Sequence, residues 1–236
     1  MSLLKGKYLV LLAGLVLIGC GGGGGSPKSG GQNFDPNDYP KYNLTQENKD
    51  DLAYMGNEER LAYNVYMGLY DYFQDKDIEI KQLYNIANKS ESYHISIVRD
   101  LVRKYEITPS DLTIISSPVG SSSEDQSELP ADKYGVEHIQ ELYDALMAKG
   151  KNSQQDALEV GCMVEVTDIY DLDERIENAK ESGAQDLIDG FNILRNGSYN
   201  HYWAFDDGLK ALGVDDGCCS LGVIDGVDYC HPEYPK

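Results

Sequence analysis

The sequence predicts an all-α protein in which four long helices form a bundle and a long crossover joins the second helix to the third. Three observations lead to this fold class. Apolar residues recur at steps of three and four in four long segments, as they do on one face of a helix. No segment alternates convincingly between apolar and polar residues, as a half-buried strand does. Nearly fifty residues separate the second and third segments, whereas short turns join the other pairs.

The helical segments follow one another in a simple order. Thr45 is a suitable N-cap for the first, and a shorter amphipathic helix lies within the crossover. We expect long helices over residues 45–74, 78–105, 153–182 and 184–212, and a short one over 135–149. In an up-down bundle, one long crossover at this point is typical of the ferritin-like topology.

The first twenty residues have the pattern of a signal peptide. Lys5 and Lys7 precede the apolar run Tyr8–Ile18, which is too short to span a bilayer as a mature helix. The run ends in the letters LIGC, residues 17–20, which resemble the lipobox of prokaryotic lipoproteins. That resemblance implies cleavage before Cys20, a lipid on its sulfur, and an extracytoplasmic protein anchored on the periplasmic or cell-surface side of a prokaryotic membrane. An ordinary secretory signal and a bare membrane anchor are the alternatives.

The chain therefore divides into four regions. We expect the lipoprotein signal peptide at 1–19, and the lipidated cysteine with a flexible Gly-rich tether at 20–44, because the letters GGGGGSPKSGG cannot bury apolar surface. The helical domain follows at 45–213 and a cysteine-containing tail at 214–236. The lipid anchor at Cys20 makes the membrane the first expected partner.

The net charge restricts the other partners. The chain carries a formal net charge of −20. Such a surface repels phosphate, so nucleic acid is not an expected partner. The charge does not identify a substrate, and the sequence leaves open whether the bundle forms a homodimer.

Each long helix carries ligand-type residues on its apolar stripe. Carboxylates buried near one another cannot all stay ionised without a compensating positive charge. Carboxylates combined with imidazoles suit iron or manganese, and zinc is a further candidate. The sequence thus predicts a metal site, with the ligands Glu59, Glu91, His94, Glu165, Asp168 and His201.

Other interpretations exist for these residues. Of the neighbours Glu58 and Glu59, one is expected to face solvent, and the stripe continued by Ala62 and Tyr66 favours Glu59 as the buried one. Taken alone, Glu91 and His94 would be a surface pair on one helix face, and His201 a core histidine. Spacing alone cannot settle whether both Glu165 and Asp168 reach the site. Ser198 and Asn200 orient ligands or are ordinary polar neighbours, and Tyr66, Tyr93 and Tyr170 line the site or pack between helices.

Several motifs resemble known families. The letters ERLAYNVY at 59–66, ESYH at 91–94 and EVTDIY at 165–170 are similar to the first three helix motifs of rubrerythrins. Together with VGCMVEVTDIYDL and GSYNHYWAF, in this order, they resemble the DUF2202 family of ferritin-like proteins over residues 52–213. The resemblance implies a carboxylate–histidine di-iron site and an oxidoreductase that reduces dioxygen or peroxide, as a rubrerythrin-like peroxidase, or oxidises ferrous iron, as a ferroxidase.

The chain departs from the rubrerythrin pattern at two points. Ser198 stands three residues before His201, where a rubrerythrin has a glutamate, so one bridging carboxylate is missing and Asp168 is the candidate to replace its oxygen. The chain also lacks a paired Cys-x-x-Cys module, so the electron donor is unknown. Whether the protein is an enzyme is therefore open. The alternative is a non-catalytic metal-binding or protein-interaction module of the cell envelope.

The tail contains three cysteines and a histidine. In an exported protein we expect a disulfide from Cys230 to Cys218 or to Cys219. The remaining thiol pairs with Cys162 or stays free, and a small metal site is a second interpretation of the tail. Cys162 itself is expected to be a small core residue, with a redox thiol as the alternative.

Overall fold

The computed structural model describes residues 34–115 and 130–236, and in them the chain is all-α apart from one short hairpin. The predicted signal peptide, Cys20 and most of the tether lie outside the described residues. The helices are α1 (Gln46–Gln74), α2 (Lys81–Ile86), α3 (Ser92–Lys104), α4 (Glu137–Gly150), α5 (Gln154–Ser182) and α6 (Gln185–Ala211). These bounds confirm the predicted helices to within a few residues, except that α2 and α3 share the second one.

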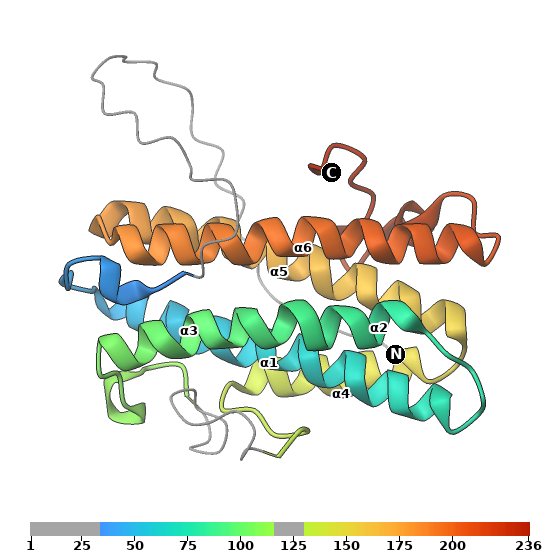
Figure 1. Ribbon diagram of the computed structural model, residues 1–236, viewed down its shortest axis with the longest axis horizontal. Helices are drawn as coiled ribbons and strands as arrows, with labels where there is room; N and C mark the ends of the chain where they lie inside the picture. Colours follow the sequence, from blue (N-terminus) through green and yellow to red (C-terminus); the bar gives the residue numbers. More distant parts are fainter. Residues whose placement is uncertain (1–33, 116–129) are drawn as a thin grey trace.

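The helices pack lengthwise into a bundle. Figure 1 shows α1, α2 with α3, α5 and α6 running along the long axis of the molecule, with α4 on the outside. α4 packs against both α1 and α5. The crossover therefore returns along the outside of the bundle before the chain enters α5.

Local sequence signals fix the ends of the long helices. The Thr45 hydroxyl accepts a hydrogen bond from the backbone N–H of Asn48. The side-chain oxygen of Asn48 in turn accepts one from the backbone N–H of Thr45. Ser153 caps α5 in a similar way, by accepting from the N–H of Asp156. Gly183 ends α5 with φ of 70°, a left-handed conformation that glycine adopts without strain.

A π-helical turn, Ala87–Glu91, joins α2 to α3. Such turns are rare, and they occur frequently at functional sites. Glu91 is the last residue of this turn, and His94 lies in the first turn of α3. The irregular turn therefore coincides with two of the predicted ligands.

Two apolar clusters form the core, one toward each end of the bundle. Leu61, Val65 and Phe205 belong to the first cluster. Leu52 and Phe191 belong to the second. On α1, α5 and α6 the change from one cluster to the other falls at or beside the predicted ligands. The polar site therefore separates two hydrophobic cores.

The end of the crossover is fastened to α1 beside the site. Arg60 is buried, donates to the carbonyls of Pro130 (3.0 Å) and Lys133, and lies over the ring of Tyr134 at 4.4 Å. Asn57 accepts a hydrogen bond from the backbone of Gly135 at 3.0 Å. These contacts hold the crossover against the helix that carries Glu59.

Two disulfides hold the tail. Cys219 pairs with Cys230 around the hairpin of β1 (Val223–Ile224) and β2 (Val227–Asp228), which confirms one of the two expected pairings. Cys162 pairs with Cys218 in the 3-10 turn Gly217–Leu221. Cys162 is fully buried, as expected of a core residue, and its disulfide confirms the alternative in which the remaining thiol pairs with Cys162. The redox-thiol interpretation was wrong, because this sulfur is bonded to Cys218.

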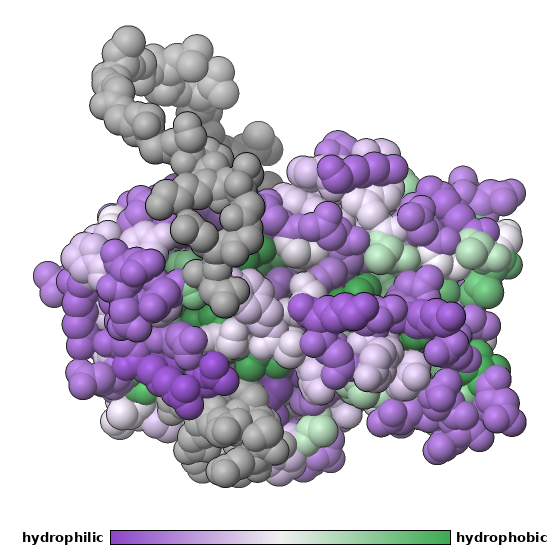
Figure 2. Space-filling view, viewed as in Figure 1, coloured by the Kyte–Doolittle hydropathy of each residue, from purple (hydrophilic) through white to green (hydrophobic). Residues whose placement is uncertain are grey.

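The visible surface is polar. Figure 2 shows mainly hydrophilic residues on one face of the molecule, with smaller hydrophobic areas between them, in keeping with the high net negative charge. Within residues 34–115 and 130–236, no helix has both the length and the apolarity needed to cross a membrane.

Candidate metal centre

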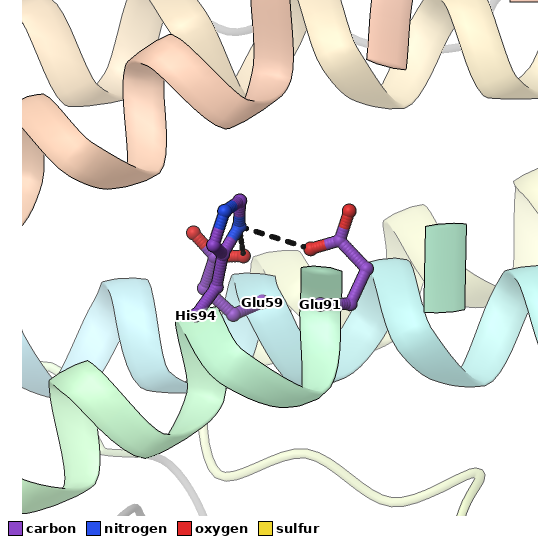
Figure 3. A group of neighbouring side chains, drawn as sticks. All are labelled: Glu59, Glu91 and His94. Carbon is purple, nitrogen blue, oxygen red and sulfur yellow. Dashed lines mark hydrogen bonds and ion pairs between the residues drawn. The ribbon is translucent and has the colours of Figure 1, made fainter. Parts of the chain in front are cut away.

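Three predicted ligands, from α1, the π turn and α3, converge in the core. His94 Nδ1 lies 3.1 Å from Glu59 Oε2 and 3.2 Å from Glu91 Oε2 (Figure 3). All three side chains are almost fully buried. The two carboxylates thus face one ring nitrogen from α1 and from the π turn, which contradicts the surface-pair interpretation of Glu91 and His94.

A second group of three lies directly beside the first. His201 Nδ1 lies 2.9 Å from Glu91 Oε1 and 3.3 Å from Glu165 Oε2. The His94 and His201 rings are 5.5 Å apart, measured between their centres. Helices α5 and α6 therefore complete the arrangement that α1 and α3 begin.

Glu91 belongs to both groups. Its Oε2 faces His94 and its Oε1 faces His201, so one carboxylate connects the two imidazoles. Ligand atoms at right angles around one ion, each about 2.1 Å from it, stand about 3 Å from each other. The nitrogen–oxygen distances in both groups are close to this value. Each group could hold one metal ion, and Glu91 would serve both.

The pKa shifts in the cluster reflect an excess of buried negative charge. Burial raises the pKa of Glu59 well above its ordinary value, and the negative charges of Asp168 and Glu91 raise it further. Burial would also raise the pKa of Glu91, but the charges of the two imidazoles outweigh it and place this pKa below the usual range. Burial lowers the pKa of His201, yet Glu165 and Glu91 raise it to about 10. Without another cation, the imidazoles must keep their protons to balance the carboxylates.

Unpaired oxygens show that the cluster can accept a cation. Glu59 Oε1 and Asp168 Oδ1 are buried, and neither has a hydrogen-bond partner. A buried acceptor without a donor is costly, and a metal ion is one way to compensate it. The residues therefore fit a metal pair, because their donor atoms are of the right type and two of their buried oxygens have no hydrogen-bond partner.

Asp168 lies at the edge of the centre and belongs to neither compact group. Its Oδ2 accepts a hydrogen bond from Ser198 Oγ. Burial, followed by the negative charge of Glu165, raises the pKa of Asp168 to about 8. Ser198 thus orients the carboxylate of Asp168, the candidate additional ligand.

Of the three tyrosines considered, Tyr66 is at the site. It is fully buried and donates a hydrogen bond to Glu165 Oε1. Tyr93 instead accepts from the backbone N–H of Phe34, and Tyr170 is 45% exposed. Asn200 is also exposed and bonds to a backbone carbonyl of its own helix, so the interpretation of Asn200 as a ligand-orienting group was wrong.

The prediction that either Glu58 or Glu59 faces solvent was also wrong. Glu58 is only 2% exposed, and neither of its carboxylate oxygens has a hydrogen-bond partner. Burial raises its pKa well above the ordinary value, and the charges of Asp171 and Asp168 raise it further. Glu58 is thus a buried carboxylate on the side of α1 that packs against α5, whereas Glu59 lies beside His94 of α3.

A glycine leaves the space that one ligand occupies. A Cβ atom on Gly197 of α6 would stand 2.4 Å from His94 Nε2, which is too close for any side chain. Ser90 Oγ lies 3.4 Å from the same nitrogen. Sequence reasoning missed Gly197, because the signal is an absent side chain on a neighbouring helix.

Comparisons with known proteins identify the family and a solved relative. The family model described as "Uncharacterized protein domain (DUF2202)" matches residues 48–219. The chain is 32% identical to "Uncharacterized protein MJ0754" of Methanocaldococcus jannaschii over 174 residues, which are 74% of this chain and 81% of the relative. The crystal structure of MJ0754 superposes with a TM-score of 0.61 at 31% identity, covering 74% of this chain and 86% of that one.

Proposed function

The chain belongs to the DUF2202 family, and for this member we propose that the buried glutamate–histidine cluster holds a pair of metal ions. One observation carries the proposal. Glu91 directs one carboxylate oxygen toward each of two buried imidazoles, and each imidazole has a further carboxylate of its own. Glu59 and His94 would hold one ion, Glu165 and His201 the other, and Glu91 both.

The donor set favours iron. Carboxylate and imidazole together suit iron or manganese, and zinc is a third candidate. Bound iron would pass electrons to dioxygen or peroxide, and in the ferroxidase case these electrons would come from ferrous iron. We therefore propose oxidoreductase chemistry of the rubrerythrin-like peroxidase or ferroxidase class.

The protein's own residues would prepare the site for this chemistry. Tyr66 donates to Glu165 and so fixes that carboxylate. Ser198 does the same for Asp168. The apolar clusters at either end exclude water, which strengthens electrostatic interactions at the centre. Asp168, with an unpaired oxygen, is our candidate for an additional ligand.

The fold and location that we propose follow from the chain order. A bundle whose one long crossover lies between its second and third long helical segments supports the ferritin-like topology. The LIGC sequence and the glycine tether support a lipid anchor at Cys20 and an extracytoplasmic position.

Metal content of anaerobically purified protein tests the proposal. We expect two iron or manganese ions per chain after reconstitution, and their loss in the double variant Glu91→Ala/His94→Ala. Replacing Cys219 and Cys230 together by alanine is the control, because that disulfide lies in the tail outside the metal groups. Failure of the wild type to retain metal would refute the metal pair.

Spectroscopy then separates two roles for a protein that does bind metal. The iron-loaded protein should change its absorption spectrum on mixing with dioxygen or peroxide. If metal is bound and neither oxidant changes the spectrum, the oxidoreductase proposal is wrong, and a non-catalytic metal-binding role in the envelope stands instead.

A further inference from the structure

A line of carboxylates leads away from the metal centre between α1 and α5. Asp168 lies at the edge of the centre on α5, and Asp171 lies one turn further along the same helix. Tyr54, one turn before Glu58 on α1, donates a hydrogen bond to Asp171, which places Glu58 beside this face of α5. The charge of Asp171 acts on Glu58 more strongly than that of Asp168. We call Asp168, Glu58 and Asp171 the acidic path.

The inner part of the acidic path contains buried carboxylate oxygens that have no hydrogen-bond donor. Glu58 is 2% exposed and Asp168 is 4% exposed. Both oxygens of Glu58 and one of Asp168 have no hydrogen-bond partner. A proton shared between Glu58 and Asp171 would satisfy one of these oxygens and leave the others unpaired. Buried carboxylates are costly in this state, so three oxygens facing this seam indicate a site for a cation.

The outer part of the path reaches solvent. The Asp171 side chain is 21% exposed, which is far more than Glu58 or Asp168. Tyr54 donates to Asp171 Oδ2 at 3.1 Å, and Arg175 lies 3.2 Å from Oδ1. These two contacts hold Asp171 at the mouth of the path. Arg175 also pairs with Glu174 and Asp51, and its charge acts on Glu58 as well, but it makes no hydrogen bond to either oxygen of Glu58.

We propose that the acidic path is a transit site, through which a divalent cation such as Fe²⁺ or Mn²⁺ passes from solvent to the metal centre. This inference rests on the proposed metal pair and adds the route and the class of cation. The path offers oxygen ligands alone, which suit hard cations. Among the described residues, only the two groups of the centre bring three ligand atoms within 4.8 Å of one another. The looser spacing of the path suits passage rather than permanent binding.

The consequence for the reaction is specific. An entry route for free cations is of use to a protein that takes up ferrous iron as a substrate, and it has no role in a site loaded once during folding. The path therefore favours ferrous iron oxidation over peroxide reduction as the chemistry of the centre. Two ferrous ions at the centre would each give one electron to one dioxygen molecule, which would take up two protons from solvent and leave as hydrogen peroxide.

The test compares the full chain with the double variant Glu58→Gln/Asp171→Asn, which keeps the shape of both side chains. Mn²⁺ binding is followed by the electron paramagnetic resonance of the free ion, and loading of the centre by stopped-flow measurement. The wild type should bind two Mn²⁺ ions tightly and a third weakly. The variant should keep the two tightly bound ions and lose the weakly bound one. Its metal centre should load about tenfold more slowly, because the acidic path no longer attracts the cation.

A matched control removes a charge beside the path. Glu174→Gln takes one negative charge from an exposed side chain that also contacts Arg175, and it should load at the wild-type rate. If the double variant does not fold, as judged by circular dichroism, Glu58→Gln alone provides the same comparison. Loading at the wild-type rate, or a third ion that persists, would overturn the acidic path while leaving the metal pair intact. Absence of the two tight ions from the wild type would instead refute the proposed function.

Discussion

At the scale of single residues, Gly197 determines whether His94 can occupy its place. The imidazole fills the space beside Gly197 while its other nitrogen faces Glu59 and Glu91. The ring cannot retreat from a new side chain without leaving the carboxylates. Space on α6 is thus as necessary to the centre as the ligand on α3.

Gly197→Ala should therefore weaken metal binding. The added methyl group would displace the ring, and we expect the metal affinity to fall by about 10- to 100-fold, as when a group that orients a ligand is lost. Isothermal titration with Mn²⁺ measures this. Gly68→Ala is the matched control, since its methyl group would meet only the flexible end of Met147 and should leave the affinity unchanged. Equal affinities in the two variants would show that His94 is not a ligand.

Asp51 provides a test of pH dependence away from the metal centre. Burial raises its pKa from an ordinary value of 3.8 to about 6, although Asn178 donates a hydrogen bond to it. The folded protein thus binds a proton more tightly than the unfolded chain. Ionisation of Asp51 therefore costs folding free energy as the pH rises from about 4 through about 6.

Asp51→Asn should remove that cost. Between pH 4 and pH 7 the stability of the variant relative to the wild type should rise by about 2 kcal/mol. The pKa shift corresponds to about 3 kcal/mol at about 1.4 kcal/mol per pKa unit, and solvent screening of an incompletely buried carboxylate reduces this value. Urea unfolding at both pH values measures the difference. Asp71→Asn, on the exposed side of the same helix, is the control and should show no such trend. A difference that does not grow with pH would contradict the raised pKa.

At the scale of elements, the periodic helices were predictable and the irregular parts were not. The three- and four-residue steps identified α1, α5 and α6 with their ends, and they also aligned Glu59, Glu91 and Glu165 on inward faces. The same periodicity cannot distinguish two adjacent residues when both are buried, so Glu58 was missed. The π turn was missed because it follows no sequence signal that we could recognise.

The tail was predictable only in part. Three cysteines in an exported chain predict a disulfide, and Cys219–Cys230 is one. The sequence left the remaining thiol either paired with Cys162 or free, because the packing of the tail on the bundle, which brings Cys218 to a residue 56 positions earlier on α5, cannot be read from cysteine spacing. Likewise, the two-residue strands of the hairpin are too short to show alternation.

The two disulfides should differ in their contributions to stability. Cross-linking residues 56 apart restricts the unfolded chain more than cross-linking residues 11 apart. We expect Cys162→Ala/Cys218→Ala to lower the free energy of unfolding by about 4 kcal/mol, and Cys219→Ala/Cys230→Ala by about 3 kcal/mol. Chemical denaturation of both variants measures the order. The reverse order would show that the Cys162–Cys218 link is not formed in solution.

At the scale of the whole molecule, the described residues form a polar helical domain whose N-terminal segment packs against the helices. The Lys104 ammonium group lies between the carbonyls of Pro36, Tyr39 and Pro40 and the carboxylate of Asp186, and so fixes the segment that leads into α1. The segment before α1 is therefore bound to the helical domain from near the first described residue. The proposed anchor lies before the described residues, at Cys20.

Cys20→Ser tests that anchor. The variant should accumulate as an uncleaved precursor without lipid, because the sulfur that receives the lipid is absent. Mass spectrometry and fractionation of cells measure the change, and Cys219→Ser/Cys230→Ser, which removes one disulfide from the tail, is the control. A Cys20→Ser protein that is processed like the wild type would refute the lipoprotein interpretation.

The separation of the core into two apolar clusters has a consequence for how the protein opens. Each cluster can hold its own half of the bundle, and the carboxylates between them repel one another unless a cation joins them. Removal of metal should therefore accelerate amide hydrogen exchange around residues 58–60, 91–94, 165–168 and 198–201, while both halves stay protected. The metal pair would then link two folding units. Its loss would leave a molecule that opens locally around the metal centre while both ends keep their protection from exchange.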